Sequence, residues 1–481
     1  MYLKQQSFLV LGLSRSGTAA TEFLLSQKAT VYVYDDIVSE RVEKMAQALE
    51  NKGARRIKKE ELNKAIDICD VLVLSPGIPI DHALAVAFKK AGKAVVGESE
   101  LAARYLCGTV IAVTGTNGKT TTVSMLAQVL QKGGFEAQAC GNIGTPMLTL
   151  YPMQEKAVAV AEISSFQMET LNSLRPHIAM VLNITEDHLN RHYNMENYVF
   201  LKRKLLKNLT EAEFAVLNYD DPTVRSFAEK VKATVLYFSV RERVNGAYYE
   251  NGALYFGKEK ILALTDLPTG GLHNVQNALA TIIAAKIMGV STQDIAAALS
   301  DFKGIKHRVE FIAEIGGVRY VDDSKGTNVD ATLKAVAAVN AETVLLLGGK
   351  DKGYDYDKLF NGLKRGKVAH AILYGENRFK LLESARRTGF SGVTVCENFS
   401  FAVQIARIKA SRGQTVLLSP ASASFDEFAS YEERGEKFAE IIRSFTQDEA
   451  KTSLADGRGK DTERLENDTD DGDEIVDSET E

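Results

Sequence analysis

The sequence has little of what a disulfide framework, a metal–thiolate centre or a membrane span requires. Its 481 residues include only four cysteines, which are scattered and form no Cys-x-x-Cys pair, so these sites are not expected. No run of 18 apolar residues occurs, and we therefore expect no transmembrane helix. The first residues, Met1-Tyr-Leu-Lys4, lead into a strand pattern and lack a signal-peptide pattern. These absences favour a cytoplasmic enzyme.

The net charge of −5 conceals an uneven distribution along the chain. Residues 451–481 contain 12 acidic and 4 basic residues, which leaves the rest of the chain at about +3. No long basic run occurs, so binding to nucleic acid is not expected. The acidic end has almost no apolar residues, and we expect it to be a disordered, solvated tail. A docking segment is the alternative interpretation.

Residues 111–122, Ile-Ala-Val-Thr-Gly-Thr-Asn-Gly-Lys-Thr-Thr-Thr, carry the clearest chemical signal. A β-branched apolar stretch leads into a glycine-rich turn, and an apolar helical pattern follows at once. A strand, a glycine loop and a helix N-terminus in this order are typical of a phosphate site. We expect Lys119 to reach the β- and γ-phosphates of a nucleotide, and Thr120 or Thr121 to bind Mg²⁺.

The spacing of this motif departs from the standard phosphate loop. Gly115 precedes Gly118 by only three positions, and Val113 occupies the place of the earlier glycine. An ordinary glycine-rich turn with a surface lysine is therefore the alternative interpretation.

The first segment, about 1–97, has strand patterns that alternate with helical stretches, which predicts a parallel, doubly wound sheet. The loop at 12–17 resembles a dinucleotide fingerprint, with acidic residues at Asp35 and Asp36. However, Ser14 stands at the middle glycine position and argues against standard NAD binding. A nucleotide in another pose and a plain strand–helix turn both stay open.

The second segment, about 98–303, continues with two further strand patterns after the phosphate loop. One ends at Glu162, and the other ends shortly before His188. Ligands collect at the carboxyl ends of strands in open α/β sheets, so Lys119, Glu162 and His188 should share one cleft. Glu162 is a candidate Mg²⁺ ligand, with a structural glutamate as the alternative. Asn142 could orient a phosphate or a substrate amide, or simply occupy a turn.

The third segment begins near residue 304 and again predicts a parallel α/β domain. Its strands end in the loops 322–328, 348–352 and 419–424, which should lie at one edge of the sheet.

In the second segment, the predicted helix around Tyr198–Lys204 carries three basic residues, and by itself it indicates only a solvated charged face.

Together these motifs resemble the Mur ligases, the ATP-dependent amino-acid-adding enzymes of peptidoglycan synthesis. Thr114-Gly-Thr-Asn-Gly-Lys-Thr-Thr121 matches the short phosphate loop of that family, and the resemblance covers about residues 5–445. It points to the branch that adds D-glutamate to UDP-N-acetylmuramoyl-L-alanine. The residues that carry it are Ser75-Pro-Gly-Ile-Pro79, Glu162-Ile-Ser-Ser-Phe-Gln167, Asp323-Ser-Lys-Gly-Thr-Asn328 and Ser419-Pro-Ala-Ser-Ala-Ser-Phe-Asp-Glu-Phe428. We find neither the Asp-Asn-Pro-Arg motif of the lysine- or diamino-acid-adding branch nor the glycine-rich start of the alanine-adding branch.

The resemblance implies an α/β fold of three domains. The expected parts are a Rossmann-like UDP-sugar domain (1–97), a central P-loop ATPase-like domain with a parallel sheet (98–303), a Rossmann-like amino-acid-binding domain (304–448) and a disordered acidic tail (449–481). It also implies a monomer whose substrates are ATP, D-glutamate and UDP-N-acetylmuramoyl-L-alanine.

The family's functional residues carry over to this sequence by motif. Lys119, His188 and Lys202 would carry the catalysis. One Mg²⁺ would be bound by Thr120 and Glu162, and a second by His188 and a carbamylated lysine at Lys202, with Lys204 as the other possible position. ATP would be bound by Gly115, Thr116, Asn117, Gly118, Lys119, Thr120, Thr121, Asn277, Arg308 and Asp323. D-Glutamate would contact Thr327, Lys352, Ser424 and Phe425, and the UDP-sugar would contact Ser14, Arg15, Ser16, Asp35, Asp36, Ser75 and Asn142.

Three other functions compete with this interpretation. A related ligase with another acceptor, such as a folylpolyglutamate or cyanophycin-type enzyme, is disfavoured by the loop at 12–17 and by the 419–424 motif. A phosphate-loop protein without catalysis is disfavoured by the set Lys119, Glu162, His188 and Lys202. An NAD-dependent dehydrogenase fails at Ser14.

Overall fold

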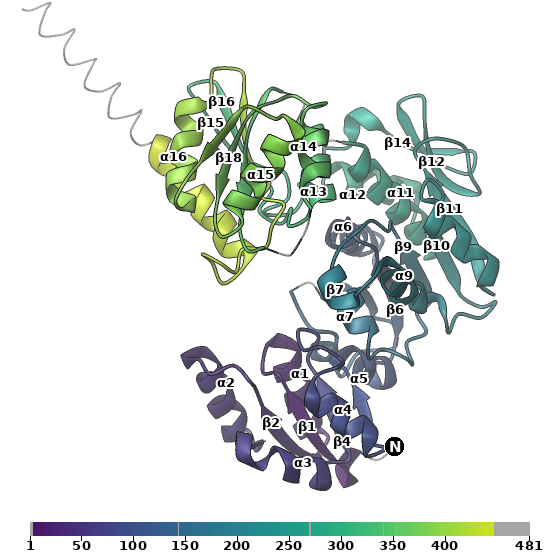
Figure 1. Ribbon diagram of the computed structural model, residues 1–481. Coiled ribbons are helices and arrows are strands. Elements are labelled where there is room, and N and C mark those ends of the chain that lie inside the picture. Colours follow the sequence, from purple (N-terminus) through teal and green to yellow (C-terminus); the bar gives the residue numbers. More distant parts are fainter. Residues whose placement is uncertain are drawn as a thin grey trace, which may run out of the picture. The chain divides into compact units, whose positions relative to one another are not determined.

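The computed structural model describes residues 3–142, 144–268, 271–339, 341–351, 353 and 355–446. Lys352 and the acidic end of the chain lie outside the described residues. The chain divides into two compact units, and the division falls between Ile305 and Lys306 (Figure 1). The first unit contains a five-stranded and a nine-stranded sheet, and the second contains a six-stranded sheet. The three predicted domains with the bounds 1–97, 98–303 and 304–448 divide the chain more finely than these two units, and their bounds stay a prediction.

The five-stranded sheet is parallel throughout, as predicted, in the order β3-β2-β1-β4-β5. Phe8 and Val10 of the central strand pack into one apolar core, and Leu9 and Leu11 pack into another, so both faces of the sheet are covered. The strands are β1 (Ser7–Leu11), β2 (Thr30–Tyr34), β3 (Arg55–Arg56), β4 (Val71–Leu74) and β5 (Ala94–Val96), and the helices are α1 (Arg15–Ser26), α2 (Glu40–Asn51), α3 (Leu62–Ile68) and α4 (Ala83–Lys90).

The nine-stranded sheet places the phosphate-loop strand between the strands that end at Glu162 and near His188, in the order β14-β13-β12-β11-β10-β9-β6-β8-β7. Its strands are β6 (Thr109–Thr114), β7 (Ala137–Gly141), β8 (Val158–Glu162), β9 (Ile178–Val181), β10 (Phe214–Asn218), β11 (Thr234–Ser239), β12 (Gly246–Glu250), β13 (Ala253–Phe256) and β14 (Glu259–Ala263). Its longer helices are α5 (Glu98–Tyr105), α6 (Lys119–Lys132), α9 (Met195–Arg203), α11 (Leu272–Ile287) and α12 (Thr292–Ser300), and its short ones are α7 (Ser165–Met168), α8 (Leu189–His192) and α10 (Pro222–Arg225).

This sheet is not parallel throughout, because β13 runs antiparallel to both of its neighbours, β12 and β14. Asn251 and Gly252 connect β12 to β13 with φ values of 46° and 75°. An Asn-Gly pair with both φ angles positive is the signature of a type I′ hairpin turn, which can join only antiparallel neighbours. Local turn chemistry therefore explains this departure from the predicted parallel sheet.

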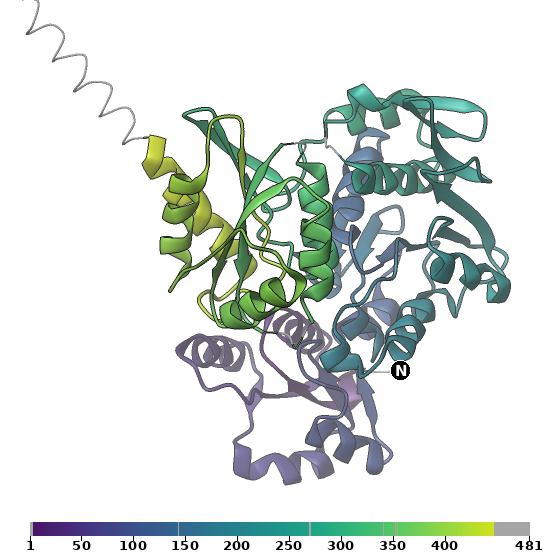
Figure 2. The ribbon, with the colours of Figure 1, turned by 45° about the horizontal axis from the view of Figure 1, so that its top comes forward.

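The six-stranded sheet of the second unit has helices on both of its faces (Figure 2). Val344 and Leu346 of β17 pack into one apolar core, whereas Leu345 and Leu347 pack into another. The order is β15-β16-β20-β17-β18-β19, with β15 antiparallel at the edge. The strands are β15 (Glu310–Ile315), β16 (Val318–Asp322), β17 (Thr343–Gly348), β18 (Val368–Tyr374), β19 (Val393–Val395) and β20 (Thr415–Leu418), and the helices are α13 (Val329–Ala338), α14 (Asp357–Leu363), α15 (Arg378–Thr388), α16 (Phe399–Lys409) and a last helix over 431–446.

No helix in the described part of the chain combines the length and the apolar character that a membrane crossing requires.

A buried glutamate joins the start of α5 to the body of the first unit. Glu98 is only 1% exposed, and its carboxylate accepts a hydrogen bond from the Leu148 backbone N–H at 2.6 Å. Burial raises the pKa of Glu98 from 4.5 to about 7, against the opposing effect of the hydrogen bonds from Leu148 and Ser99. The folded chain therefore holds this proton more tightly than the unfolded chain does.

A buried arginine organises the loops of the second unit. Arg434, in the last helix, has no exposed surface. Its guanidinium donates hydrogen bonds to the hydroxyl and carbonyl of Ser324 at 2.9 and 2.8 Å, and to the carbonyls of Ser422 and Ala423 at 3.2 and 3.3 Å. One side chain thus connects the loop after β16 to the loop after β20.

We expect Glu98→Gln to flatten the pH dependence of stability. Because the pKa of Glu98 is higher in the folded chain, its contribution to stability decreases as the pH rises from about 4.5 to about 7, and it stays constant above that range. Urea unfolding at pH 5, 6, 7 and 8 should show a smaller loss of stability for Glu98→Gln than for the unsubstituted chain. The exposed control Glu155→Gln should keep the original slope. An unchanged slope for Glu98→Gln would contradict the assignment.

We expect Arg434→Met to destabilise the second unit by roughly 3–5 kcal/mol, because it leaves four buried acceptor atoms without their donor. Arg443→Met is the matched control, since Arg443 is exposed on the same helix. Thermal unfolding followed by circular dichroism compares the two variants. Equal melting temperatures would rule out the role given to Arg434.

Candidate active site

The phosphate loop connects β6 directly to α6 through Gly115–Gly118. Gly118 has a φ of 86°, and a Cβ atom there would lie 2.4 Å from Oδ1 of Asn277. Gly115 has a φ of 150° and lies against Leu182 and Asn183. Both positions require glycine, because a side chain would be strained and would collide with its neighbours. The three-position spacing therefore produces a tight loop at a helix N-terminus, which is a site for anions.

Two lysines donate hydrogen bonds to the same carbonyl of this loop. Nζ of Lys119 lies 2.8 Å from the carbonyl oxygens of Gly115 and Thr116. Nζ of Lys202, from α9, lies 2.8 Å from the carbonyl oxygen of Gly115 and 4.6 Å from the centre of the Tyr198 ring. The loop therefore brings two lysine amino groups to the place where phosphate groups would bind.

The environment of Lys202 favours its neutral amine. The side chain is 1% exposed, and burial lowers its pKa well below the usual value. The charge of Lys119 lowers the pKa of Lys202 further, whereas Asp187 and Glu162 oppose the change. A neutral lysine amine is the form that can react with carbon dioxide, so the site fits a carbamylated lysine chemically.

Oxygen ligands for a metal ion occur at the end of β8. Glu162 is 3% exposed, and its carboxylate accepts a hydrogen bond from Oγ1 of Thr120 and another from Nδ2 of Asn142, each at 2.8 Å. The neighbouring hydroxyl Oγ1 of Thr121 is buried and has no hydrogen-bond partner among the described residues. A carboxylate and a hydroxyl beside a phosphate loop fit Mg²⁺, which prefers oxygen ligands.

Residues of α9 and of the segment after β9 hold the loop in place. Oγ1 of Thr116 lies 3.0 Å from the hydroxyl of Tyr198 and donates a hydrogen bond to the Thr185 carbonyl at 3.0 Å. The side chain of Asn183 both accepts from and donates to the backbone of Asn117, at 2.8 and 3.0 Å. The backbone of the loop is therefore rigidly supported before any ligand binds.

His188 has a left-handed backbone, with a φ of 56°, at the start of α8. Its Nε2 lies 3.6 Å from a carboxylate oxygen of Asp187, and its ring packs on Phe166 with a centroid distance of 4.7 Å. Because β9, β6 and β8 are neighbours and parallel, His188, Lys119 and Glu162 follow strands that end at the same edge. The sequence prediction placed these three side chains at that edge for the same reason.

Asn277 reaches the phosphate-loop helix from α11. It is 4% exposed, and its Oδ1 accepts a hydrogen bond from Oγ1 of Thr122 at 3.3 Å. Its Nδ2 donates to Asn274 at 3.3 Å. The contact explains how a residue far along the sequence joins this site.

Six of the seven predicted UDP-sugar residues follow β1, β2 and β4 of the first sheet, and the seventh, Asn142, follows β7 of the nine-stranded sheet. Ser14 is the N-cap of α1, and both Ser14 and Arg15 are exposed, with Ser16 half-buried. Ser75 is buried instead, and its hydroxyl donates to the Gly12 carbonyl at 2.7 Å. Its hydroxyl therefore supports the 12–17 loop in this structure.

Asp35 and Asp36 follow β2, and each makes a defined contact. The Asp35 carboxylate accepts hydrogen bonds from the backbone N–H groups of Leu13 at 2.7 Å and of Ile37 at 2.9 Å. A carboxylate oxygen of Asp36 lies 3.0 Å from Nε2 of His82. Asp35 thus fixes the loop beside it.

Arg191 joins the loops of the two sheets of the first unit. Its guanidinium pairs with Glu169 at 2.6 Å and donates to the carbonyls of Pro76, Gly77 and Ile78 at 3.4, 3.3 and 2.7 Å. The loop after Ser75 therefore lies beside the segment that carries His188. Sequence reasoning missed Arg191, although it stands only three positions after His188.

In the second unit, Arg308 and Asp323 are electrostatic neighbours. Asp323 accepts a hydrogen bond from Oγ of Ser419 at 2.7 Å. Burial raises the pKa of Asp323 from 3.8 to about 7, while Arg308 and Ser419 lower it. Nε of Arg308 is buried, and no group in the described part of the chain accepts a hydrogen bond from it. These are polar groups at the edge where the loops 322–328 and 419–424 meet.

Three of the four residues predicted to bind D-glutamate lie in or next to those loops. Thr327 is half-buried, Ser424 is 2% exposed, and the side chain of Phe425 is 70% exposed. Lys352 lies outside the described residues. Arg434, which joins these loops, was missed because nothing in its local sequence distinguishes it from a solvated helix arginine.

Three family models match the chain and together cover most of it. They are the Mur ligase MurD-like N-terminal domain over residues 6–97, the Mur ligase middle domain over 113–285, and the Mur ligase glutamate ligase domain over 307–422. The proteins named UDP-N-acetylmuramoylalanine--D-glutamate ligase from Thermoanaerobacter sp. (strain X514) and Koribacter versatilis (strain Ellin345) are 40% and 39% identical to it. The alignments cover 92% and 94% of this chain and 99% and 100% of those proteins.

Solved structures share the fold at low sequence identity. UDP-N-acetylmuramate-alanine ligase MurC from Thermotoga maritima has a TM-score of 0.61 at 17% identity and covers 92% of this chain and 100% of its own. MurF from Acinetobacter baumannii has a TM-score of 0.57 at 19% identity, with 87% and 91% covered. The prediction of a three-domain α/β fold is confirmed. On its matching domains and its nearly full-length relatives, this chain belongs to the Mur ligase family.

Proposed function

We propose that this chain adds D-glutamate to the carboxylate of UDP-N-acetylmuramoyl-L-alanine, with hydrolysis of ATP to ADP and phosphate, in the synthesis of peptidoglycan precursors. The observation that carries the proposal is the loop Gly115–Gly118, with Lys119, Lys202 and the Thr120–Glu162 pair around it. Nearly full-length relatives named for this activity support it. We place the reaction in the cytoplasm, where ATP is made, and expect a monomer.

The phosphate loop is the proposed ATP site. The loop residues Thr116, Asn117 and Gly118, the N-terminus of α6 and the ammonium of Lys119 would surround the phosphates, with Thr121 beside them. Asn277 would contact the nucleotide from α11, and Arg308 and Asp323 would contact it from the second unit. The buried Nε of Arg308, which has no acceptor within the described ranges, supports a ligand-binding role for that residue.

Two magnesium ions are proposed at this edge of the sheet. Thr120 and Glu162 would hold the first, and His188 with the carbamate of Lys202 would hold the second. The ions would neutralise the charge that develops on the transferred phosphoryl group. The depressed pKa of Lys202 supports carbamylation at this lysine, whereas Lys204 donates its hydrogen bond to the Met168 carbonyl.

The substrate residues are proposed from the loops that carry them. Exposed Ser14, Arg15 and Asp36, together with Ser16, Asp35, Ser75 and Asn142, would form the UDP-sugar site. Thr327, Lys352, Ser424 and Phe425 would bind D-glutamate, with the lysine facing a carboxylate.

Two successive displacements would complete the reaction. A carboxylate oxygen of the UDP-sugar substrate attacks the γ-phosphorus of ATP, and the bond to the β-phosphate oxygen breaks to release ADP. The amine of D-glutamate then attacks the carbonyl carbon of the acyl phosphate, and the tetrahedral intermediate loses a proton and expels phosphate. The loop and its lysines act by positioning and by neutralising charge.

Phosphate release from ATP tests the proposed reaction. Purified chain with Mg²⁺ and UDP-N-acetylmuramoyl-L-alanine should release phosphate with D-glutamate and not with L-glutamate, L-lysine or diaminopimelate. Lys119→Ala should reduce this turnover to background, because it removes the ammonium that holds the phosphates. Release with a different amino acid would replace the proposed acceptor, and no release with any of them would reject the ligase activity.

Lys202→Ala should lose activity and regain part of it in the presence of acetate. A small carboxylate can supply the oxygen anion that the carbamate would provide at this buried position. Lys204→Ala is the matched control from the same helical segment and should keep its activity without acetate. If acetate restores Lys204→Ala instead, the carbamate belongs to Lys204. Restoration of neither variant would argue against a carbamate here.

A further inference from the structure

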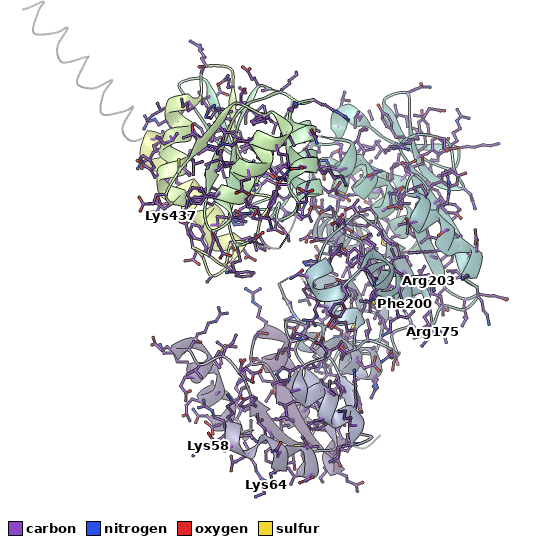
Figure 3. The ribbon with its side chains drawn as sticks, viewed as in Figure 1. Lys58, Lys64, Arg175, Phe200, Arg203 and Lys437 are labelled. Atoms are coloured by element: carbon purple, nitrogen blue, oxygen red, sulfur yellow. The ribbon has the colours of Figure 1, made fainter. Side chains whose placement is uncertain are left out.

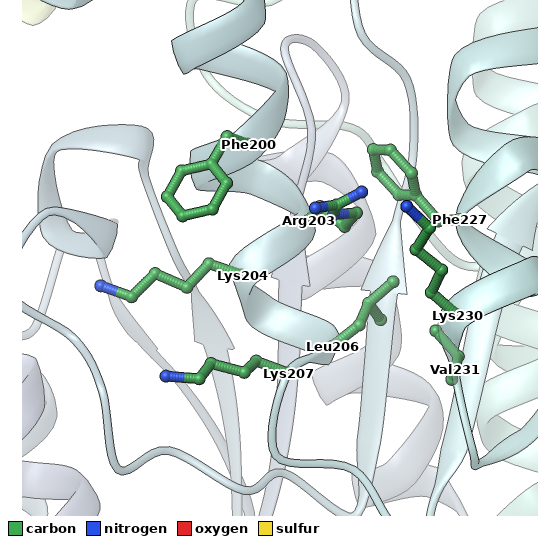
Figure 4. A pocket seen from close by; sticks show the side chains of 8 residues that line it. All are labelled: Phe200, Arg203, Lys204, Leu206, Lys207, Phe227, Lys230 and Val231. Atoms are coloured by element: carbon green, nitrogen blue, oxygen red, sulfur yellow. The ribbon is translucent and has the colours of Figure 1, made fainter.

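A pocket on the first unit lies outside the site described above. It encloses about 380 Å³ next to the C-terminal end of α9, between η4 (Lys204–Leu206) and η5 (Ser226–Lys230) (Figure 4). Its apolar part comes from Phe200, Leu206 and Phe227, of which Phe200 is 56% exposed and the other two are buried. An exposed aromatic ring over a buried apolar floor is a feature of binding surfaces.

The rim of this pocket carries positive charge only. Four of its eight lining residues are basic, and none is acidic. Figure 4 shows Lys204 and Lys207 to one side of Leu206, with Arg203 and Lys230 on the other side near Phe227. Lys204 donates a hydrogen bond to the Met168 carbonyl at 2.7 Å, and burial together with the charge of Lys207 lowers its pKa.

The other three cations have no counter-charge in the described part of the chain. Other basic groups of this unit do have one: Arg175 pairs with Glu213, Lys286 with Glu259, and Arg243 with Glu250. By contrast, the side chains of Arg203, Lys207 and Lys230 make no ion pair or hydrogen bond with any described residue. Like charges brought together beside an apolar floor favour a ligand that is both acidic and partly apolar.

The chain itself contains a segment with that chemistry. Residues 466–481 contain nine acidic and no basic residues, and their only aliphatic pair, Ile475-Val476, is flanked by Asp473, Glu474 and Asp477. The four basic residues of 451–481 all precede this stretch. An aliphatic pair between carboxylates matches an apolar floor between ammonium and guanidinium groups.

We propose that residues 466–481 dock in this pocket of the same chain, with Ile475-Val476 against Phe200, Leu206 and Phe227 and the flanking carboxylates near the basic rim. Exposed ion pairs are individually weak, so such contacts would hold a free peptide poorly. Covalent attachment within the same chain can supply an effective concentration of roughly millimolar, which compensates for the weak contacts. The stretch from 447 to 474 can extend over roughly 90 Å, so it does not restrict the segment to its own unit.

Docking would bring the acidic segment against the helix that carries Lys202. Arg203 lines the pocket, whereas the neighbouring Lys202 is buried and contacts the phosphate loop. The occupant of the pocket and the phosphate loop would therefore share α9 as a common element. The docking proposal does not depend on the proposed ligase activity, because it rests on the pocket and on the charge of the segment.

Tryptophan fluorescence of the full chain tests this proposal. The sequence contains no tryptophan, so Phe200→Trp places the only such fluorophore at the pocket. In the full chain at low salt, we expect the emission of this tryptophan to be blue-shifted and its fluorescence to be protected from quenching by acrylamide. Both should be lost when Asp473→Asn, Glu474→Gln and Asp477→Asn are introduced together, and also in 1 M salt, where the Debye length is about 3 Å.

Matched controls separate docking from a general effect of charge. Asp456→Asn, Asp461→Asn and Glu463→Gln remove the same number of charges from residues 451–465, which precede the docking segment and contain the basic residues, and should keep the protection. The pair Lys207→Ser and Lys230→Ser should lose the protection from acrylamide. The control pair Lys58→Ser and Lys64→Ser should keep it, because these exposed lysines lie in and just before the α3 region of the five-stranded sheet (Figure 3).

Two outcomes would overturn the proposal. Equal quenching of the tryptophan in the full chain and in the variant without charges at 473, 474 and 477 would show that the pocket is not covered by this segment. Protection that disappears on dilution, with the charges intact, would assign the pocket to the segment of a second copy. The assay measures fluorescence only, so a failure here leaves the proposed ligase reaction to be judged by its own experiment.

Discussion

The carbonyl oxygen of Gly115 is the acceptor on which the central site depends. Two lysines place Nζ 2.8 Å from this one atom: Lys119, at the start of α6, and Lys202, near the C-terminal end of α9. Two ammonium groups so close repel each other, and one of them is fully buried, so the neutral form of Lys202 is favoured. The arrangement holds only because Gly115 and Gly118 adopt backbone angles that a residue with a side chain resists.

Buried polar side chains connect segments that are distant in the chain, and they do so at each of the loop clusters. Thr116, Tyr198 and Thr185 connect the phosphate loop to two later segments. Arg434 connects the loops after β16 and β20. Each contact satisfies a group whose burial would otherwise be costly, and each also limits the motion of a loop that would bind a ligand. Stability and preorganisation of the site therefore come from the same hydrogen bonds.

The helix α9 illustrates how one element can serve two surfaces. Tyr198 and Lys202 are buried, and both contact the phosphate loop. Phe200 and Arg203, on the same helix, line a pocket with a basic rim. A helix turns by about 100° per residue, so residues a few positions apart can face different surroundings. Whatever binds at the pocket therefore contacts the backbone that positions Lys202.

Local patterns in the sequence were sufficient for some features and not for others. The strand–loop–helix signal at 111–122 and the alternation of strands with helices predicted the phosphate loop and the doubly wound sheets, because both depend on contacts between near neighbours. The shared edge of Lys119, Glu162 and His188 also followed from the rule for parallel strands. The antiparallel hairpin β12–β13 was missed, although Asn251-Gly252 signalled it.

Only the tertiary structure decided which distant groups meet. The bridge from Arg191 to Pro76, Gly77 and Ile78, the burial of Ser75 against Gly12, and the fully buried Arg434 depend on how separate segments pack. The same holds for the depressed pKa of Lys202, which arises from burial and from Lys119. By itself the sequence determined the family, the phosphate loop and the types of residue around it. Tertiary packing decided the pKa values of these residues. A pKa depends on how far a side chain is removed from solvent and on which charges lie near it, and the local sequence specifies neither.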